Sequence, residues 1–199
     1  MYAIVEDNNI TQYINYPKSV VIGDVRYPAK IFELWTTAEK EAIGIYEIVV
    51  DKTNYKDPAY YNNTNSSYTF ADGQVTESWG TATAKELEDR NATDEDGVEL
   101  DPVVVIKGLK SQKKDIVKQQ ASGLLEKTDW HNHKALDDDT YTIPDNVKTY
   151  RANVRAKSNE METQINACTN VDELKALYEY TTQEDGTQTR PLAEFPEEI

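Results

Sequence analysis

LLEKTDW, from Leu124 to Trp130, decides how the second half of this chain folds, because a helical pattern ends there and a polar connection begins. A second helical pattern starts after the connection in IPDNVKTYRANVR, Ile143 to Arg155, where proline is well suited to the first helical turn. These segments predict a helical hairpin. We expect Trp130 to be its core anchor, and the alternative is an exposed contact for a partner.

Apolar residues recur at helical spacing on both sides of the connection. The first stripe consists of Leu109, Ile116, Val117, Ala121, Leu124 and Leu125. The second consists of Val147, Tyr150 or Arg151, Val154, Met161 and Ile165. Asn170 and Glu173 then have the spacing of a helix-capping box, which predicts a third, short helix. Residues 102–181 are therefore predicted to form a hairpin domain of two to three helices, followed by an extended tail, 182–199, that only a partner would order.

The N-terminal part has the short, β-branched segments and tight turns of a β-rich module, residues 1–80. Asp7 to Asn9 and the pair Asp72-Gly73 each predict a hairpin turn, with Tyr2 and Ile4 on one face of the first strand and Ala3 and Val5 on the other. Between the hairpins we expect a short helix from Ala38 that Gly44 ends, and then a strand, Ile45 to Asp51.

Residues 81–101 are charged and poor in bulky apolar side chains. We interpret them as an acidic linker with a short helix at 84–90. The predicted fold class is therefore α+β, with a small β-rich N-terminal module followed by an α-helical hairpin.

The composition limits the partners of the chain. Its 199 residues carry a formal charge of −15, and a field of that sign repels the phosphate backbone of nucleic acids. The basic run from Lys107 to Lys114 is typical of the solvated face of a helix. No apolar run is long enough to span a bilayer, and the N-terminus lacks the pattern of a signal peptide. We therefore expect no nucleic-acid partner, no membrane partner and synthesis in the cytoplasm.

The residues that often perform chemistry do not form a convincing active site. Cys168 is the single cysteine and lies in a helical pattern, which favours a small buried apolar role. His131 and His133 with Asp137 leave a metal-dependent hydrolase as a remote alternative. The acidic segment from Thr93 to Asp101 fails the spacing of an EF-hand calcium loop. We expect no enzymatic activity, no catalytic or metal-binding residues and no cofactor.

Arg151 and Arg155 are one helical turn apart, so their side chains share a face. They could form a fork for an acidic partner. We favour a structural interpretation, in which they clamp acidic groups of the TDW connector such as Asp129.

LLEKTDW together with YRANVR resembles the tail assembly chaperone-like domain of tailed bacteriophages, and the wider pattern resembles the tail and tail-fibre structural proteins of marine cyanophages. The residues that match are Leu125, Thr128, Asp129, Trp130, Tyr150, Arg151 and Arg155. The segment IPDNVKT departs from that family, which often has an aromatic residue shortly before the Tyr-Arg pair. The N-terminal half carries a weaker resemblance to the β-rich modules that precede this domain.

This resemblance implies a non-enzymatic protein of the virion tail, a structural component of the fibre or baseplate that acts through protein–protein contacts. The alternative is an assembly chaperone that is not retained in the virion. In both cases the implied partners are other phage tail proteins within a larger oligomeric assembly, and the seven matching residues are the candidate interface.

Overall fold

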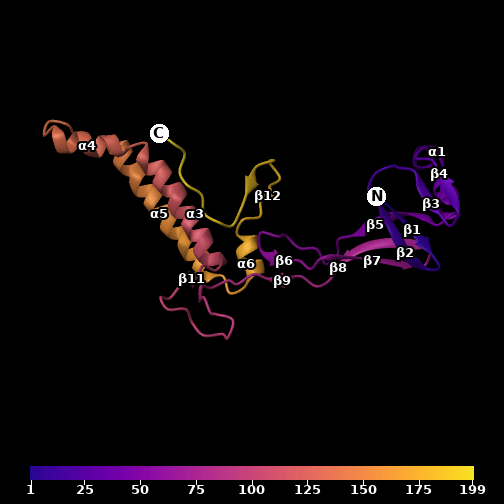
Figure 1. Cartoon of the computed structure of the whole chain (residues 1–199). Helices are drawn as coiled ribbons and strands as arrows, with labels where there is room; N and C mark the ends of the chain where they lie inside the picture. The colour runs from indigo at the N-terminus through magenta and orange to yellow at the C-terminus, as the bar shows by residue number, and fades with distance from the viewer. The chain divides into compact units, whose positions relative to one another are not determined.

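The computed structural model describes residues 1–199, and the chain divides into two compact units, Met1–Thr83 and Ala84–Ile199. Unit 1 is built around a five-stranded sheet, and unit 2 holds the long helices (Figure 1). The coarse prediction of a small β-rich module followed by helices is confirmed. The division falls close to residue 80, where the predicted module ends.

The sheet of unit 1 has the strand order β2-β1-β5-β8-β7. Its members are β1 (Tyr2–Glu6), β2 (Asn9–Ile14), β5 (Ile45–Asp51), β7 (Ser66–Ala71) and β8 (Gln74–Trp79). The pairs are antiparallel except for β5 and β8, which run parallel. Two small ladders accompany the sheet: β3 (Val20–Ile22) with β4 (Val25–Tyr27), and β6 (Tyr61–Asn62) with β9 (Thr83–Ala84).

Both predicted hairpins of unit 1 are confirmed. Asp7, Asn8 and Asp72 have positive φ angles, as does Gly73, and this left-handed backbone matches the twist of tight hairpin turns. The predicted faces of β1 are confirmed as well, because Ile4 packs in one cluster with Tyr2 at its edge while Ala3 and Val5 pack in another. β1 is therefore covered on both sides.

Two short helices, α1 (Ile31–Leu34) and α2 (Thr37–Glu41), precede β5. The Thr36 hydroxyl accepts a hydrogen bond from the Glu39 amide, and the Glu39 carboxylate accepts one from the Thr36 amide at 2.8 Å, so α2 begins with a capping box. Gly44 follows with a φ of 83°, where a Cβ would lie 2.5 Å from the Val5 carbonyl oxygen. Glycine is required there by both the backbone angle and the close approach.

Unit 2 contains four helices: α3 (Leu109–Glu126), α4 (Asp129–Asp137), α5 (Asp145–Ala167) and α6 (Val171–Ala176). The long helices α3 and α5 lie side by side (Figure 1). They run in opposite directions, since Lys114 near the start of α3 bonds to Asn166 near the end of α5, whereas Arg151 near the start of α5 bonds to Leu125 near the end of α3.

The predicted apolar face of α5 is buried throughout, with Tyr150 and Arg151 both inside. On α3 the predicted stripe is only partly correct. Leu109, Val117 and Ala121 are buried, but Ile116 is 46% exposed because it lies beside the stripe that faces α5.

Three predictions about connecting segments are wrong. The polar connector HNHKALD is helical in α4, since its alanine, leucine and lysine are good helix formers and Asp129 lies at the N-terminal end of the helix dipole. No helix forms at 84–90. Instead β10 (Arg90–Asn91) pairs with β11 (Val105–Ile106), and the intervening residues form an arm.

The third concerns the C-terminal tail, which packs on unit 2 of its own chain. After α6 a small ladder of β12 (Thr181–Thr182) and β13 (Gln188–Thr189) turns the chain. The remaining residues return to the helices, where Leu192 is buried.

Candidate functional site

The Arg151 guanidinium is the centre of the TDW region. One of its nitrogens, Nη1, donates to the Leu125 carbonyl oxygen at 2.8 Å and to the Thr128 hydroxyl at 2.7 Å. The other, Nη2, lies 2.7 Å from a carboxylate oxygen of Asp129. Arg151 is only 8% exposed and Thr128 only 7% exposed, so these bonds form largely out of water. The predicted clamp on Asp129 is confirmed for Arg151.

This arrangement stabilises the junction of two helices. The Leu125 carbonyl belongs to the last turn of α3, where carbonyl groups lack intrahelical partners and a cation is favourable. Asp129 begins α4, where a carboxylate is favourable. The Thr128 hydroxyl completes the network by donating to the Leu125 carbonyl at 3.0 Å. Arg151 therefore ties the end of α3 and the start of α4 to α5.

Arg155 does not join this clamp. Its Nη1 donates to the Arg151 carbonyl at 3.4 Å, and its side chain lines a shallow pocket with Lys118, Ser122 and Asn159. The prediction that both arginines clamp the connector is wrong for Arg155, which is exposed. Tyr150 lies on the buried side of α5 and packs with Ala121 and Val154.

The core-anchor interpretation of Trp130 is wrong, because the residue is 54% exposed. It stands in the first turn of α4 with its ring stacked on the imidazole of His131, at a centroid distance of 3.7 Å. The Tyr141 hydroxyl in turn contacts Nδ1 of His131, and the ammonium of Lys134 lies 4.3 Å from the centre of the Tyr141 ring. The alternative interpretation, in which Trp130 is an exposed contact for a partner, remains.

A pocket of about 370 Å³ lies beside this aromatic group. It is lined by Lys127, Thr128, Trp130, His131, Pro144, Asn146, Val147 and Ile199. The candidate interface residues Thr128 and Trp130 therefore line the same pocket.

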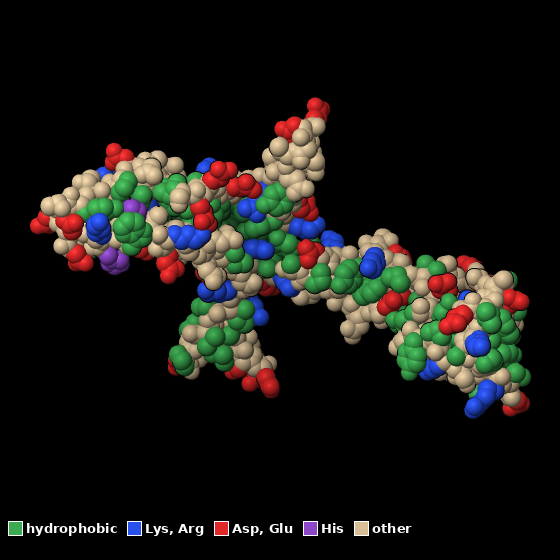
Figure 2. All heavy atoms as spheres, turned by 90° about the horizontal axis from the view of Figure 1, so that it is seen from above, with side chains coloured by type: hydrophobic (Ala, Val, Ile, Leu, Met, Phe, Trp, Pro, Cys, Tyr) green, Lys and Arg blue, Asp and Glu red, His purple; other side chains and the backbone are tan.

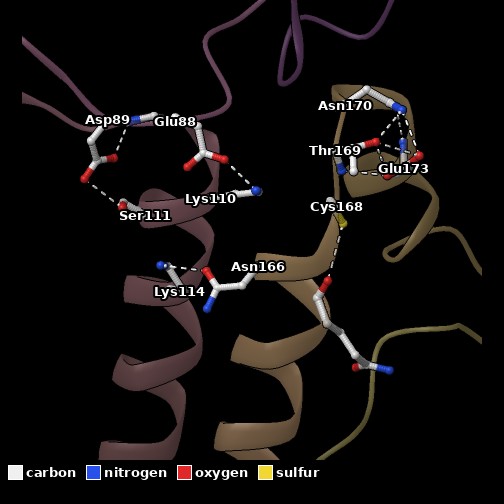
Figure 3. Close-up of polar contacts among 12 residues, drawn as sticks. Glu88, Asp89, Lys110, Ser111, Lys114, Asn166, Cys168, Thr169, Asn170 and Glu173 are labelled. Atoms are coloured by element: carbon white, nitrogen blue, oxygen red, sulfur yellow. Dashed lines mark hydrogen bonds and ion pairs between the residues drawn. The ribbon is translucent and has the colours of Figure 1, made fainter.

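The opposite end of α3 is capped from the preceding segment (Figure 3). The Asp89 carboxylate accepts from the Gly108 amide at 2.8 Å and from the Ser111 hydroxyl at 2.9 Å. These bonds to the charged form lower the pKa of Asp89 below its ordinary value, the amide having the larger effect. A Cβ on Gly108 would lie 2.3 Å from the Glu88 carbonyl oxygen, so the two segments touch at their backbones.

The arm between β10 and β11, taken together with β11, carries a large group of exposed aliphatic side chains. Its aliphatic side chains are 37% to 62% exposed, and they are Val98, Leu100, Val103, Val104, Val105 and Ile106. Hydrophobic side chains gather on this projection in the space-filling view (Figure 2). The predicted linker does not include this surface, although a run of β-branched residues after a charged segment is a signal for it.

Of the groups considered for chemistry, Cys168 is held in a structural role. Cys168 is buried, its thiol donates to the Gln164 carbonyl at 3.4 Å, and burial raises its pKa, which disfavours the reactive thiolate. His, Cys, Asp and Glu side chains form no group of three or more that could hold a metal ion. None of the helices combines the length and apolar character needed to cross a membrane.

Comparisons with models of protein families, with curated proteins and with solved structures found no match to this chain.

Proposed function

We propose that this chain is a non-enzymatic structural component of a bacteriophage tail, located on the fibre or baseplate and acting through contacts with other tail proteins. The observation that carries the proposal is the exposed apolar surface of the arm. Four consecutive β-branched residues, Val103 to Ile106, are each 42% to 58% exposed. Soluble monomers rarely leave such surface uncovered, and patches of this kind mark protein–protein interaction sites.

The TDW corner supports the same proposal from another part of unit 2. Trp130 is an exposed aromatic residue on a helix that Arg151 holds in place through Asp129. Aromatic residues on rigid elements are typical anchors of protein interfaces. The residues that carry the resemblance to phage tail proteins thus include both an exposed contact and the groups that position it. In this proposal α3 and α5 act as the hairpin that presents the corner.

The charge of the chain favours a polar or basic partner surface. With a formal charge of −15, it would be steered towards basic proteins and away from nucleic acid. The acidic residues of the arm, Asp94, Glu95 and Asp96, flank its apolar side chains. A partner with an apolar groove and basic rims fits this pattern.

Mass spectrometry of purified virions of the phage that encodes this chain tests the proposal. We expect peptides of the chain at a fixed stoichiometry to the other tail proteins. The variant Val104→Asp places a charge in the middle of the arm and should reduce the amount in the particle, whereas Val21→Asp, at a similarly exposed valine of unit 1, is the control. Absence of the chain from particles would reject the structural assignment.

The second candidate is an assembly chaperone that leaves before the virion is complete. It is favoured by the resemblance of LLEKTDW and YRANVR to the chaperone-like domain. It predicts that the chain is found in tail assembly intermediates and is missing from finished particles, so the same mass spectrometry on both fractions separates the candidates.

A further inference from the structure

The C-terminal residues are bound by unit 2 in the way that a protein binds a separate extended peptide. The Gln164 side chain, on α5, pairs with the backbone of the tail: its amide nitrogen donates to the Pro191 carbonyl at 3.0 Å, and its oxygen accepts from the Ala193 amide at 2.8 Å. The Leu192 amide donates to the Leu177 carbonyl at 3.0 Å. Three consecutive residues of the tail are thus held through their main chain.

Two apolar side chains and one charge anchor the same segment. Leu192 is 2% exposed, and Phe195, three residues later, packs against the cluster that contains Ala121 and Tyr150. Further along, the Lys127 ammonium reaches the Glu198 carboxylate at about 2.5 Å. Backbone capture combined with side-chain pockets at fixed spacing is how grooves recognise extended peptides. We call the surface that contacts the tail the groove. It is formed by α3, α5 and the end of α6, through Ala121, Tyr150, Gln164 and Leu177.

The segment that connects α6 to the bound residues makes few contacts of its own. Residues 179–189 are exposed throughout. The β12–β13 ladder and its turn bond mainly within themselves, as in the contacts of Gln183 with Thr187 and Thr189. At about 3.3 Å per extended residue, these eleven residues could span roughly 36 Å. The bound end is therefore attached to unit 2 by a long, exposed tether, whose contacts with neighbouring residues include the ion pair of Glu179 with Lys175 and those of Tyr180 with Arg190 and Glu194.

We propose that the groove is a binding site for an extended acidic peptide with Leu-x-x-Phe spacing, and that in the assembly it receives the C-terminal segment of a second copy of this chain. The tail observed in its own groove is the same ligand bound within one chain. Exchange of an identical segment between copies preserves the contacts of the bound residues and costs only those of the β12–β13 ladder, which opens as the tether extends. This inference names a partner for the assembly role proposed above and rests on it for its biological setting.

Concentration decides which arrangement forms. A tether of this length gives the tail an effective concentration in the millimolar range at its own groove, so dilute protein holds its tail within the chain. Neighbouring copies in an assembly raise the local concentration of foreign tails to the same range. The exchanged form then links copies while keeping the contacts of the bound tail residues, at the cost of the β12–β13 ladder.

Disulfide trapping between full-length variants tests the exchange. One chain carries Lys127→Cys and the other carries Glu198→Cys, which replaces the two partners of the observed ion pair. Cys168 is buried and remains in both chains. The variants are mixed at high concentration under mild oxidation. We expect a covalent heterodimer, because a cysteine at 198 meets a cysteine at 127 only when a tail sits in the groove of the other chain.

The control pair replaces Lys127→Cys by Lys114→Cys, at the other end of α3, about 20 Å away at 1.5 Å per helical residue. We expect several-fold less heterodimer from this pair. The double variant Lys127→Cys/Glu198→Cys in one chain, oxidised in dilute solution, should close an internal disulfide and stay monomeric. Equal heterodimer yields from the test and control pairs would overturn the exchange. That outcome would not affect the proposed role in a phage tail, because the disulfide experiment uses purified protein only. The role in the tail is tested separately by mass spectrometry of virions.

Discussion

Arg151 and Asp129 form an ion pair of 2.7 Å in which the arginine is buried and the carboxylate is half exposed. The same guanidinium donates to the Leu125 carbonyl in the last turn of α3, so the pair joins three helices at one point. Because Arg151 is desolvated, its removal would leave the Leu125 carbonyl and the Thr128 hydroxyl without their strongest donor.

Arg151→Ala should therefore lower the free energy of unfolding by about 2–4 kcal/mol. Arg151→Lys keeps the charge but loses the planar fork, and we expect a loss of about 1–2 kcal/mol. The control is Arg155→Ala, on the exposed side of the same helix, with a change within about 0.5 kcal/mol. Urea unfolding followed by far-ultraviolet circular dichroism measures all three. Similar losses for Arg151→Ala and Arg155→Ala would show that the clamp does not stabilise the corner.

Trp130→Ala should change stability by less than about 1 kcal/mol, because the side chain is more than half exposed. Tyr150→Ala is the contrasting variant. It removes a buried aromatic ring and should cost about 3–5 kcal/mol. Thermal unfolding of the two variants decides between the exposed and buried roles. If Trp130→Ala is as destabilising as Tyr150→Ala, the tryptophan supports the fold and cannot be treated as an interface residue alone.

Glu173 links the stability of α6 to pH. Its carboxylate accepts hydrogen bonds from the Thr169 amide, the Thr169 hydroxyl and the Asn170 side chain, and these lower its pKa below the ordinary glutamate value of 4.5, the Thr169 amide most of all. A folded-state pKa below the unfolded value means that the stabilisation is complete above about pH 4.5. It is lost as the pH falls through the folded-state pKa.

We therefore expect Glu173→Gln to flatten the acid side of the pH–stability curve while keeping most of the stability at low pH, since the glutamine side-chain oxygen can also accept a hydrogen bond from the Thr169 amide. Amide hydrogen exchange in α6 between about pH 5 and pH 3 measures the effect. Asp139→Asn, which removes one carboxylate from an exposed turn, controls for net charge. An unchanged pH dependence in Glu173→Gln would refute the linkage.

Gly44 and Gly23 give a matched pair in unit 1. Both have positive φ angles, but a Cβ at Gly44 would collide with the Val5 carbonyl, whereas a Cβ at Gly23 meets nothing within 4 Å. Gly23→Ala should cost about 1 kcal/mol for the backbone angle alone. Gly44→Ala should cost at least about 2 kcal/mol more, because β1 must move away from the turn. Equal midpoints of urea unfolding for the two variants would contradict this account.

The sequence predicts individual turns and helix faces of this fold better than it predicts which elements pack against one another. The Asp-Gly and Asp-Asn turns and the apolar face of α5 could be read from the sequence because turn chemistry and helical spacing depend on neighbouring residues only. The parallel pairing of β5 with β8 could not, because it depends on residues far apart in the chain.

The errors at the candidate site have the same origin. Trp130 was expected inside the hairpin because large aromatic residues usually anchor cores, but the formation of α4 turns its ring outward beside His131. The ion pair of Arg151 with Asp129 was predictable, because the two residues lie in LLEKTDW and YRANVR, the two segments that were expected to form the hairpin. The groove for the tail was not anticipated, although Leu192 and Phe195 stand out as apolar residues in an acidic terminus.

The parallel pairing of β5 with β8 also determines when unit 1 can be completed during synthesis. β1, β2 and β5 can pair as soon as residue 51 has left the ribosome, but the edge of β5 that later pairs with β8, which includes Val49 and Val50, then stays open. The β7–β8 hairpin forms from local contacts and must dock on that edge as a finished piece. A nascent chain that stalls before residue 79 therefore displays an unpaired apolar strand to its neighbours.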